Sequence, residues 1–173
     1  MSVFVAAWPD ETTVRALSGQ LAQPGTSELR WVRPQDWHVT LAFLGSVPDD
    51  DISGLVDALR SVGPSLVPAM ATMGLRTEVL GRSVLCVPVS GLDDIASSVR
   101  EATGPFNRSS DWARPFFGHL TLARSIGRRR VPREGAGASI AGAWAVSELR
   151  LVCSEVTSQG SRYTVREVVE LSG

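Results

Sequence analysis

The chain contains one twelve-residue phrase twice, as WVRPQDWHVTLA at residues 31–42 and as WARPFFGHLTLA at residues 112–123. Trp, Arg, Pro, His, Thr, Leu and Ala recur at the same offsets, 81 residues apart. The only two histidines of the chain, His38 and His119, occupy the same place in the two copies. Because imidazole exchanges protons near neutral pH, a repeat that supplies two histidines predicts one site built from two halves.

The repeat is longer than this phrase. Val3–Trp8 and Ser83–Val89 are short apolar runs, which are typical of buried strands. Each is followed by a segment with apolar residues at helical spacing and then by its motif strand. The internal repeat therefore covers about residues 3–45 and 84–126, and it predicts pseudo-twofold symmetry.

Outside the repeat, the pattern predicts a further helix at about residues 49–60 and a C-terminal hairpin formed by Ala145–Cys153 and Arg162–Leu171. The fold class is α+β, with two mostly antiparallel sheets that carry helices on their outer sides. At 173 residues, of which 43% are hydrophobic, we expect one bilobal domain over residues 1–173.

The charge composition excludes several functions. The net charge is −1, so the chain lacks the cationic surface that bulk binding of polyanions requires. All 17 basic residues are arginine, which excludes chemistry based on a Schiff-base or P-loop lysine. For Arg128–Arg130 and Arg133 we favour a solvated loop over a guide for an RNA end.

The cysteines and the N-terminus indicate the compartment. Cys86 and Cys153 each lie in an apolar run, where a buried, reduced thiol is expected. The apolar run at the N-terminus stops at Pro9, too early for a signal peptide or a membrane span. We therefore expect a cytoplasmic protein that does not associate with membranes.

The two H-x-T motifs place matching side chains on one face. Alternate residues of a strand share a face, so His38 and Thr40 point the same way, as do His119 and Thr121. If the two strands meet across a twofold axis, two imidazoles and two hydroxyls converge on one cleft. Burial of unpaired polar groups costs free energy, so their recurrence on one face favours a functional role over core packing.

This set of groups suits displacement at a phosphodiester. One imidazole takes the proton of the attacking oxygen, and the other protonates the leaving oxygen. The threonine hydroxyls donate to the non-bridging oxygens, where negative charge concentrates. Two histidines are too few ligands for a metal, and no H-x-H, H-x₃-H or C-x₂-C spacing supplies the rest. We therefore expect neither a metal nor another cofactor.

The paired H-x-T-L motifs resemble those of the bacterial RNA 2′,3′-cyclic phosphodiesterases. This family is also called 2′-5′ RNA ligase-like and belongs to the two-histidine (2H) phosphoesterase superfamily. The similarity extends to LRWVRP at residues 29–34, RPF at 114–116 and GSRY at 160–163. It implies a bilobal fold with a central cleft between the lobes. It also implies hydrolysis of a terminal ribose 2′,3′-cyclic phosphate to a 2′-phosphate, without a metal.

The resemblance also implies roles for the motif residues. His38 would be the proton donor to the departing 3′ oxygen, and His119 the proton acceptor that activates water. Thr40 and Thr121 would hold the phosphate. The residue before the second histidine is commonly proline in the family, whereas this chain has Gly118 there, which loosens the backbone.

Two substrate-binding residues follow from the same resemblance. Arg124 would contact the phosphate, and Phe43 would stack on the base. Each lies five residues after its histidine, so an ideal strand places it on the opposite face. Both reach the cleft only if the strand bends or ends there.

Three functions remain open at this point. The first is hydrolysis of 2′,3′-cyclic phosphates, with RNA 3′ ends or cyclic nucleotides as substrate and no obligate protein partner. The second is 2′-5′ RNA ligation or 2′-5′ phosphodiester cleavage, which is the same displacement reversed or on another linkage. The third is a non-catalytic module that binds RNA ends, which would not need both histidines.

Overall fold

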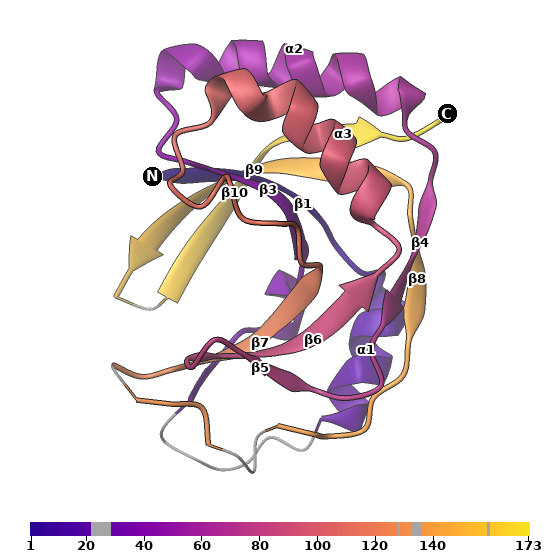
Figure 1. Ribbon diagram of the computed structural model, residues 1–173, viewed down its shortest axis with the longest axis vertical. Helices are drawn as coiled ribbons and strands as arrows, with labels where there is room; N and C mark the ends of the chain where they lie inside the picture. The colour runs from indigo at the N-terminus through magenta and orange to yellow at the C-terminus, as the bar shows by residue number, and fades with distance from the viewer. Residues whose placement is uncertain (22–28, 128, 133–135, 159) are drawn as a thin grey trace.

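The computed structural model describes residues 1–21, 29–127, 129–132, 136–158 and 160–173 (Figure 1). Of the arginines considered above for an RNA end, Arg128 and Arg133 lie outside these residues. The helices are α1 (Glu11–Gln20), α2 (Ile52–Val62) and α3 (Asp93–Thr103). The strands are β1 (Ser2–Ala7), β2 (Leu29–Trp31), β3 (Val39–Gly45), β4 (Ala69–Met73), β5 (Glu78–Leu80), β6 (Val84–Ser90), β7 (His119–Ser125), β8 (Ala143–Val146), β9 (Glu148–Thr157) and β10 (Gly160–Glu170).

The strands follow one antiparallel path in the order β10-β9-β1-β3-β7-β6-β4-β8, with β2 paired to β7 and β5 paired to β6. Helices α2 and α3 lie next to each other at one end of the molecule, and α1 lies toward the other end (Figure 1). This arrangement confirms the predicted α+β class with antiparallel strands and outer helices.

The two halves of the sheet join where β3 meets β7. Among the described residues, these strands are paired through Val39 and Leu120, each of which directly follows a motif histidine. Beyond this pair, β3 continues to β1 and β7 continues to β6. The two predicted sheets are therefore joined into one path at equivalent positions of the repeat.

A β-bulge interrupts β3 directly after its motif threonine. Opposite β1, Thr40 pairs with Ala6 and Ala42 pairs with Val5, so Leu41 is an extra residue. A bulge of this kind bends the strand and shifts the alternation of its side chains by one.

The same irregularity occurs in β7. Opposite β6, Thr121 pairs with Cys86 and Ala123 pairs with Leu85, so Leu122 is the extra residue. Both motif strands thus carry a bulge at the same position of the repeat.

The core lies between the sheet and the helices, and it contains both cysteines. Cys86 and Cys153 are buried and form no disulfide, as the apolar runs predicted. Burial, followed by the charge of Glu78, raises the pKa of the Cys86 thiol to about 11. This thiol therefore stays protonated and unreactive at neutral pH.

Four strands differ from the prediction. β4 was not predicted, because its sequence AMATM holds few of the β-branched or aromatic residues that favour strands. β5 is a three-residue strand, too short for a periodic signal. The segment 145–153 was predicted as one strand but is divided at Ser147 between β8 and β9.

Within the described parts of the chain, no helix is both long and apolar enough to cross a membrane.

Candidate active site

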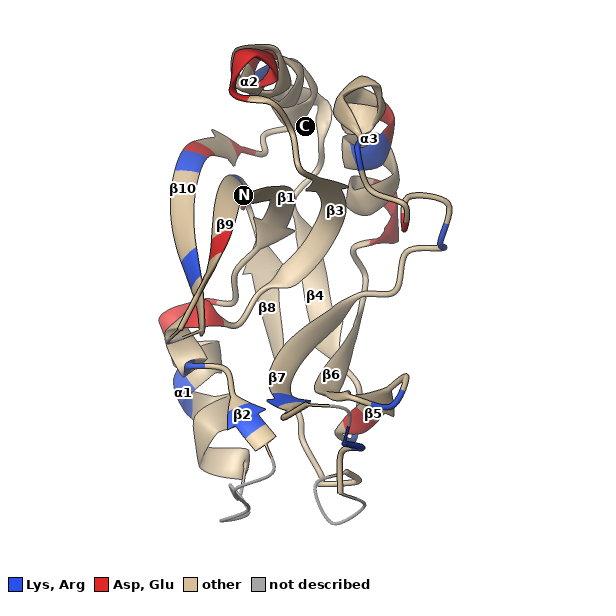
Figure 2. Cartoon of the chain, turned by 90° about the vertical axis from the view of Figure 1, so that its left-hand side faces the viewer, with Lys and Arg blue, Asp and Glu red and all other residues tan. Residues whose placement is uncertain are grey.

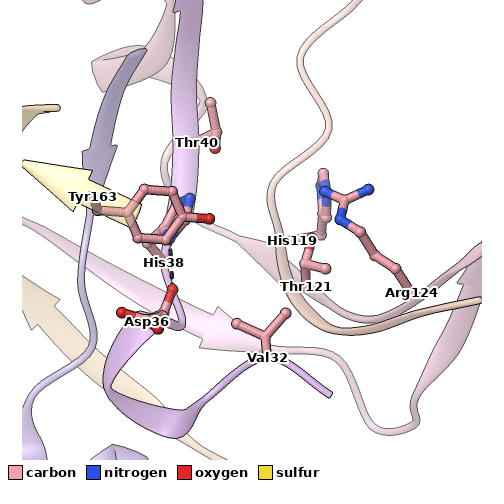
Figure 3. A pocket seen from close by; sticks show the side chains of 8 residues that line it. All are labelled: Val32, Asp36, His38, Thr40, His119, Thr121, Arg124 and Tyr163. Atoms are coloured by element: carbon pink, nitrogen blue, oxygen red, sulfur yellow. Dashed lines mark hydrogen bonds between the residues drawn. The ribbon is translucent and has the colours of Figure 1, made fainter. Parts of the chain in front are cut away.

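A pocket of about 90 Å³ lies beside the junction of β3 and β7 (Figure 3). In Figure 3, His38 and Tyr163 stand on one side of the pocket, and His119, Thr121 and Arg124 on the other. The lining residues are Val32, Asp36, His38, Thr40, His119, Thr121, Arg124 and Tyr163. Five of the six residues predicted for the site therefore line one pocket, while Phe43 lies outside its lining.

Both histidines are held in the same way. Nδ1 of His38 lies 2.7 Å from the carbonyl oxygen of Asp36, and Nδ1 of His119 lies 2.8 Å from that of Phe117. Asp36 and Phe117 occupy equivalent places, two residues before their histidines. Because a carbonyl oxygen only accepts hydrogen bonds, each Nδ1 carries a hydrogen and donates it. The atom left to exchange protons is therefore Nε2 of each ring.

The surroundings of the two imidazoles differ. His38 stacks on Phe4 at 5.0 Å and on Trp8 at 4.8 Å between ring centroids, and the edge of Tyr163 lies 5.4 Å away. For His119, the ring contact among the described residues is with Phe117, at 5.6 Å. The repeat counterparts of Phe4 and Trp8 are Leu85 and Val89, so the second half lacks this aromatic cluster.

This environment changes the protonation of His38. Burial lowers the pKa of His38 below its ordinary value of 6.5 and is the largest effect. The hydrogen bond to the Asp36 carbonyl and the Asp36 carboxylate act in the opposite direction. The charges of His119 and Arg124 add to the lowering. In the free protein at neutral pH, the imidazole of His38 is therefore mainly uncharged.

The two threonine hydroxyls point to the pocket without a protein partner. Thr40 and Thr121 line it, and neither side chain makes a hydrogen bond within the described residues. Hydroxyl groups that remain unsatisfied beside a pocket are available to a ligand oxygen.

The two bulges explain why Phe43 and Arg124, five residues after their histidines, lie on the same face of the sheet as those histidines. The extra residue, Leu41 or Leu122, shifts the alternation by one, so Phe43 and Arg124 emerge on the face of the motif histidines. Arg124 lines the pocket, whereas Phe43 is 44% exposed and lies outside the pocket lining. The bulges thus supply the departure from an ideal strand that both residues need in order to point to this face.

Three pocket residues were not predicted as part of the site. Tyr163 comes from β10, and its signal in the sequence was the segment GSRY, which carried the family resemblance without a role. Asp36 and Val32 belong to the repeated phrase. Their counterparts in the second copy, Ala113 and Phe117, do not line the pocket. The repeat alone therefore did not identify Val32 and Asp36 as pocket residues.

The repeated arginines of the phrase lie outside the pocket lining. Nε of Arg33 pairs with the Asp36 carboxylate at 2.7 Å, and Arg114 pairs with Asp111 at 3.2 Å. Among the described residues, no group of three or more His, Cys, Asp or Glu side chains is arranged to hold a metal ion. The pocket thus offers imidazoles, hydroxyls and one guanidinium, together with the Asp36 carboxylate that Arg33 neutralises.

Sequence comparison connects this arrangement with known proteins. Residues 7–71 match the family model of LigT-like phosphoesterases. An RNA 2′,3′-cyclic phosphodiesterase of Geobacillus stearothermophilus is 34% identical over 100 residues, which cover 54% of this chain and 32% of that protein. The match therefore spans about a third of the length of this curated relative.

Solved structures share the fold over the whole chain. A protein of Thermus thermophilus superposes with a TM-score of 0.84 at 26% identity, covering 100% of this chain and 99% of that one. LigT of E. coli, in complex with 3′-AMP, superposes with a TM-score of 0.77 at 22% identity, covering 99% and 98%. In its fold, its family-model match and its sequence relative, this chain is similar to the LigT-like phosphoesterases.

Proposed function

We propose that this protein is a metal-independent RNA 2′,3′-cyclic phosphodiesterase, which opens the cyclic phosphate to a 2′-phosphomonoester with two histidines as acid and base. The observation that carries the proposal is the pairing of the site. Two imidazoles, each with Nδ1 bonded to a carbonyl, and two free hydroxyls surround one pocket. The name of the relative from Geobacillus stearothermophilus supports the same substrate class.

The proposed reaction is an in-line displacement at phosphorus. Nε2 of His119 accepts a proton from water as the water oxygen attacks phosphorus. The bond from phosphorus to the 3′ oxygen breaks, and Nε2 of His38 gives its proton to that oxygen. The product keeps the phosphate on the 2′ oxygen. An acid and a base on opposite sides are what in-line geometry requires, and the two halves of the repeat supply one each.

The charge that develops on the phosphate needs donors. The hydroxyls of Thr40 and Thr121 donate to the non-bridging oxygens, and the guanidinium of Arg124 forms charge-assisted hydrogen bonds with them. These donors are already in place before substrate binds, so little reorganisation accompanies the reaction. Phe43, exposed on the same face, provides a surface on which a base stacks.

Substrate binding prepares His38 for its role as the proton donor. Burial holds the pKa of free His38 below 6.5, so the imidazole is neutral at pH 7. A phosphate anion in the pocket stabilises the imidazolium and raises this pKa. The proton donor is therefore formed in the complex with substrate.

We place the reaction in the cytoplasm, where the two buried, unbridged cysteines remain reduced.

The experiment that tests the proposal is product identification. In the presence of EDTA, the purified protein is incubated with adenosine 2′,3′-cyclic phosphate and with an RNA that ends in a cyclic phosphate. We expect a 2′-phosphate as the product, detected by phosphorus NMR. His38→Ala and His119→Ala should each abolish turnover and keep the circular dichroism spectrum. Tight binding without turnover would instead support a non-catalytic module that binds RNA ends, and full activity in either variant would overturn the two-histidine mechanism.

A further inference from the structure

Two arginines lie directly opposite each other next to the proposed site. β2 pairs with β7 so that Arg30 is the register partner of Arg124. Side chains at directly opposed positions of an antiparallel pair point to the same face, with Cβ atoms about 4.5–5.5 Å apart. Two like charges in this relationship destabilise the sheet. Figure 2 shows the basic positions of β2 and of the end of β7 next to each other.

Among the described residues, no carboxylate forms an ion pair with either guanidinium, and the Asp36 carboxylate of the pocket is paired with Arg33. Within the described residues, the side chains of Arg30 and Arg124 form no ion pair and no hydrogen bond. Other arginines of the chain do form ion pairs with carboxylates. These are Arg33, Arg60, Arg108, Arg114 and Arg150. Among the described residues, the opposed pair is therefore a local positive charge that no ion pair neutralises, and it can bind an anionic ligand.

The strand geometry places Arg30 beside the pocket rather than in it. Leu29 is buried and Trp31 packs against the core, so Arg30 points to the other face of β2. Val32, two residues further, shares that face and lines the pocket. Its amide donates to the carbonyl of Leu122 at 2.8 Å, which continues the pairing with β7. Arg30 thus lies about 6.6 Å along the strand from a pocket residue.

We propose that Arg30 is a second phosphate site, which binds the phosphate on the 5′ oxygen of the terminal nucleotide while its cyclic phosphate occupies the pocket. This inference rests on the proposed function. The offset between Arg30 and Val32 is similar to the spacing of neighbouring phosphates along an extended RNA strand. The planar guanidinium binds a phosphate with two parallel hydrogen bonds. Arg30 and Arg124 then each face one phosphate, and the two bound anions remove the repulsion between them.

The inference specifies the substrate class. A nucleoside 2′,3′-cyclic phosphate with a free 5′ hydroxyl uses the pocket alone. An RNA end also uses Arg30, because its terminal nucleotide carries a 5′ phosphodiester. The enzyme should therefore prefer RNA ends over nucleoside cyclic phosphates, and Arg30 should be the residue that determines this preference.

The test compares three substrates. They are adenosine 2′,3′-cyclic phosphate, the same compound with a 5′-phosphate, and the dinucleotide ApA with a 2′,3′-cyclic end. We expect Arg30→Ala to lower kcat/KM for the second and third by about five- to tenfold, mainly through KM, and to leave the first unchanged. The dependence of log kcat/KM on log salt concentration for the dinucleotide should become shallower by about 0.7.

Two matched variants serve as controls. Arg166→Ala removes an exposed arginine from β10 and should leave all three substrates unaffected. Arg124→Ala should slow all three, because Arg124 lines the pocket itself. An equal loss for all three substrates in Arg30→Ala, or no loss for any, would overturn the inference. A preference for the 5′-phosphorylated mononucleotide alone would overturn the assignment to an RNA chain and point to free nucleotides.

A binding measurement separates this inference from the proposed activity. By calorimetry, the wild-type protein should bind adenosine 3′,5′-bisphosphate more tightly than adenosine 3′-monophosphate, and Arg30→Ala should remove the difference. This result does not depend on turnover. An absence of turnover with this binding pattern would therefore contradict the proposed function only, whereas an unchanged pattern in Arg30→Ala contradicts the second phosphate site.

Discussion

Val39 and Leu120 lie opposite each other where β3 meets β7, and each directly follows one of the two histidines. The separation of His38 and His119 therefore depends on a backbone pairing next to them rather than on flexible loops. Because the Val39 and Leu120 side chains are fully buried, the core fixes the register of this pair. The proposed acid and base are thus positioned by rigid elements on both sides of the pocket.

The pH dependence of turnover should reveal the lowered pKa of His38. As the proton donor, His38 acts only in its protonated form, so kcat/KM falls as pH rises through its pKa in the free protein. We expect this decline to begin below pH 6.5. In kcat, the bound phosphate raises the pKa, and the decline should move to higher pH. Initial rates from pH 5 to 9 provide both profiles. A kcat/KM that continues to rise from pH 6.5 to pH 8 would show that His38 accepts the proton instead.

The folding stability should depend on pH through the same group. The unfolded chain protonates His38 near pH 6.5, whereas the folded chain does so only at lower pH. Between these two values the unfolded state binds more protons, so the free energy of unfolding rises with pH and reaches its full value above pH 6.5. Urea unfolding of wild type and His38→Gln, measured from pH 5 to 8, isolates this contribution. A constant difference between the two proteins over this range would contradict the assignment.

Removal of one threonine hydroxyl should separate activity from stability. Thr121 makes no hydrogen bond within the described residues, so Thr121→Val deletes a donor to the phosphate without breaking a bond of the fold. We expect kcat to fall by about 10²-fold, with a free energy of unfolding at least equal to that of wild type. Steady-state kinetics and urea unfolding provide the two measurements. A loss of stability as large as the loss of transition-state binding would indicate a structural role for Thr121.

Gly118 should be sensitive to a single added carbon. A Cβ at this position would lie closer to the carbonyl oxygen of Val89 than van der Waals contact allows, and against the ring of Phe116. The carbonyl of Gly118 also accepts a hydrogen bond from Val89 at 2.8 Å. We expect Gly118→Ala to lower the free energy of unfolding by about 1–3 kcal/mol and to lower kcat by displacing His119.

A control for this variant is Gly81→Ser in the turn before β6, where an added Cβ meets no atom within 4 Å. That glycine has a φ of +64°, so its substitution strains the turn but should leave kcat unchanged. If Gly118→Ala kept the stability and the kcat of the wild type, the predicted clash between the added Cβ and the Val89 carbonyl would be wrong.

The sequence was sufficient for the features that depend on local periodicity. His38, Thr40, His119 and Thr121 were predicted from the repeat and from strand alternation, and all four line the pocket. Helix α2 was predicted within a few residues of its ends, and helical segments were predicted after the first strand of each repeat, where α1 and α3 lie, because their apolar residues recur at helical spacing.

The rest of the site depends on contacts between distant segments. Tyr163 reaches the pocket because β10 pairs with β9 and β9 pairs with β1, and no short-range pattern encodes this order. The side of the sheet to which Arg124 points depends on the bulge in β7, and this bulge is visible only once β7 is paired with β6. A like-charge pair such as Arg30 and Arg124 is likewise invisible until the partner strand is known.

The aromatic cluster around His38 has a consequence for how substrate enters. A cleft with twofold symmetry presents the same groups from both sides, so a phosphate fits it in two orientations related by a half turn, and only one of them aligns the leaving oxygen with its acid. Phe4, Trp8 and Tyr163 occur on the His38 side, while the opposed arginines lie on the His119 side. Because one side of the cleft is aromatic and the other is cationic, the two orientations of the phosphate are no longer equivalent. The duplicated cleft therefore binds its substrate in one direction.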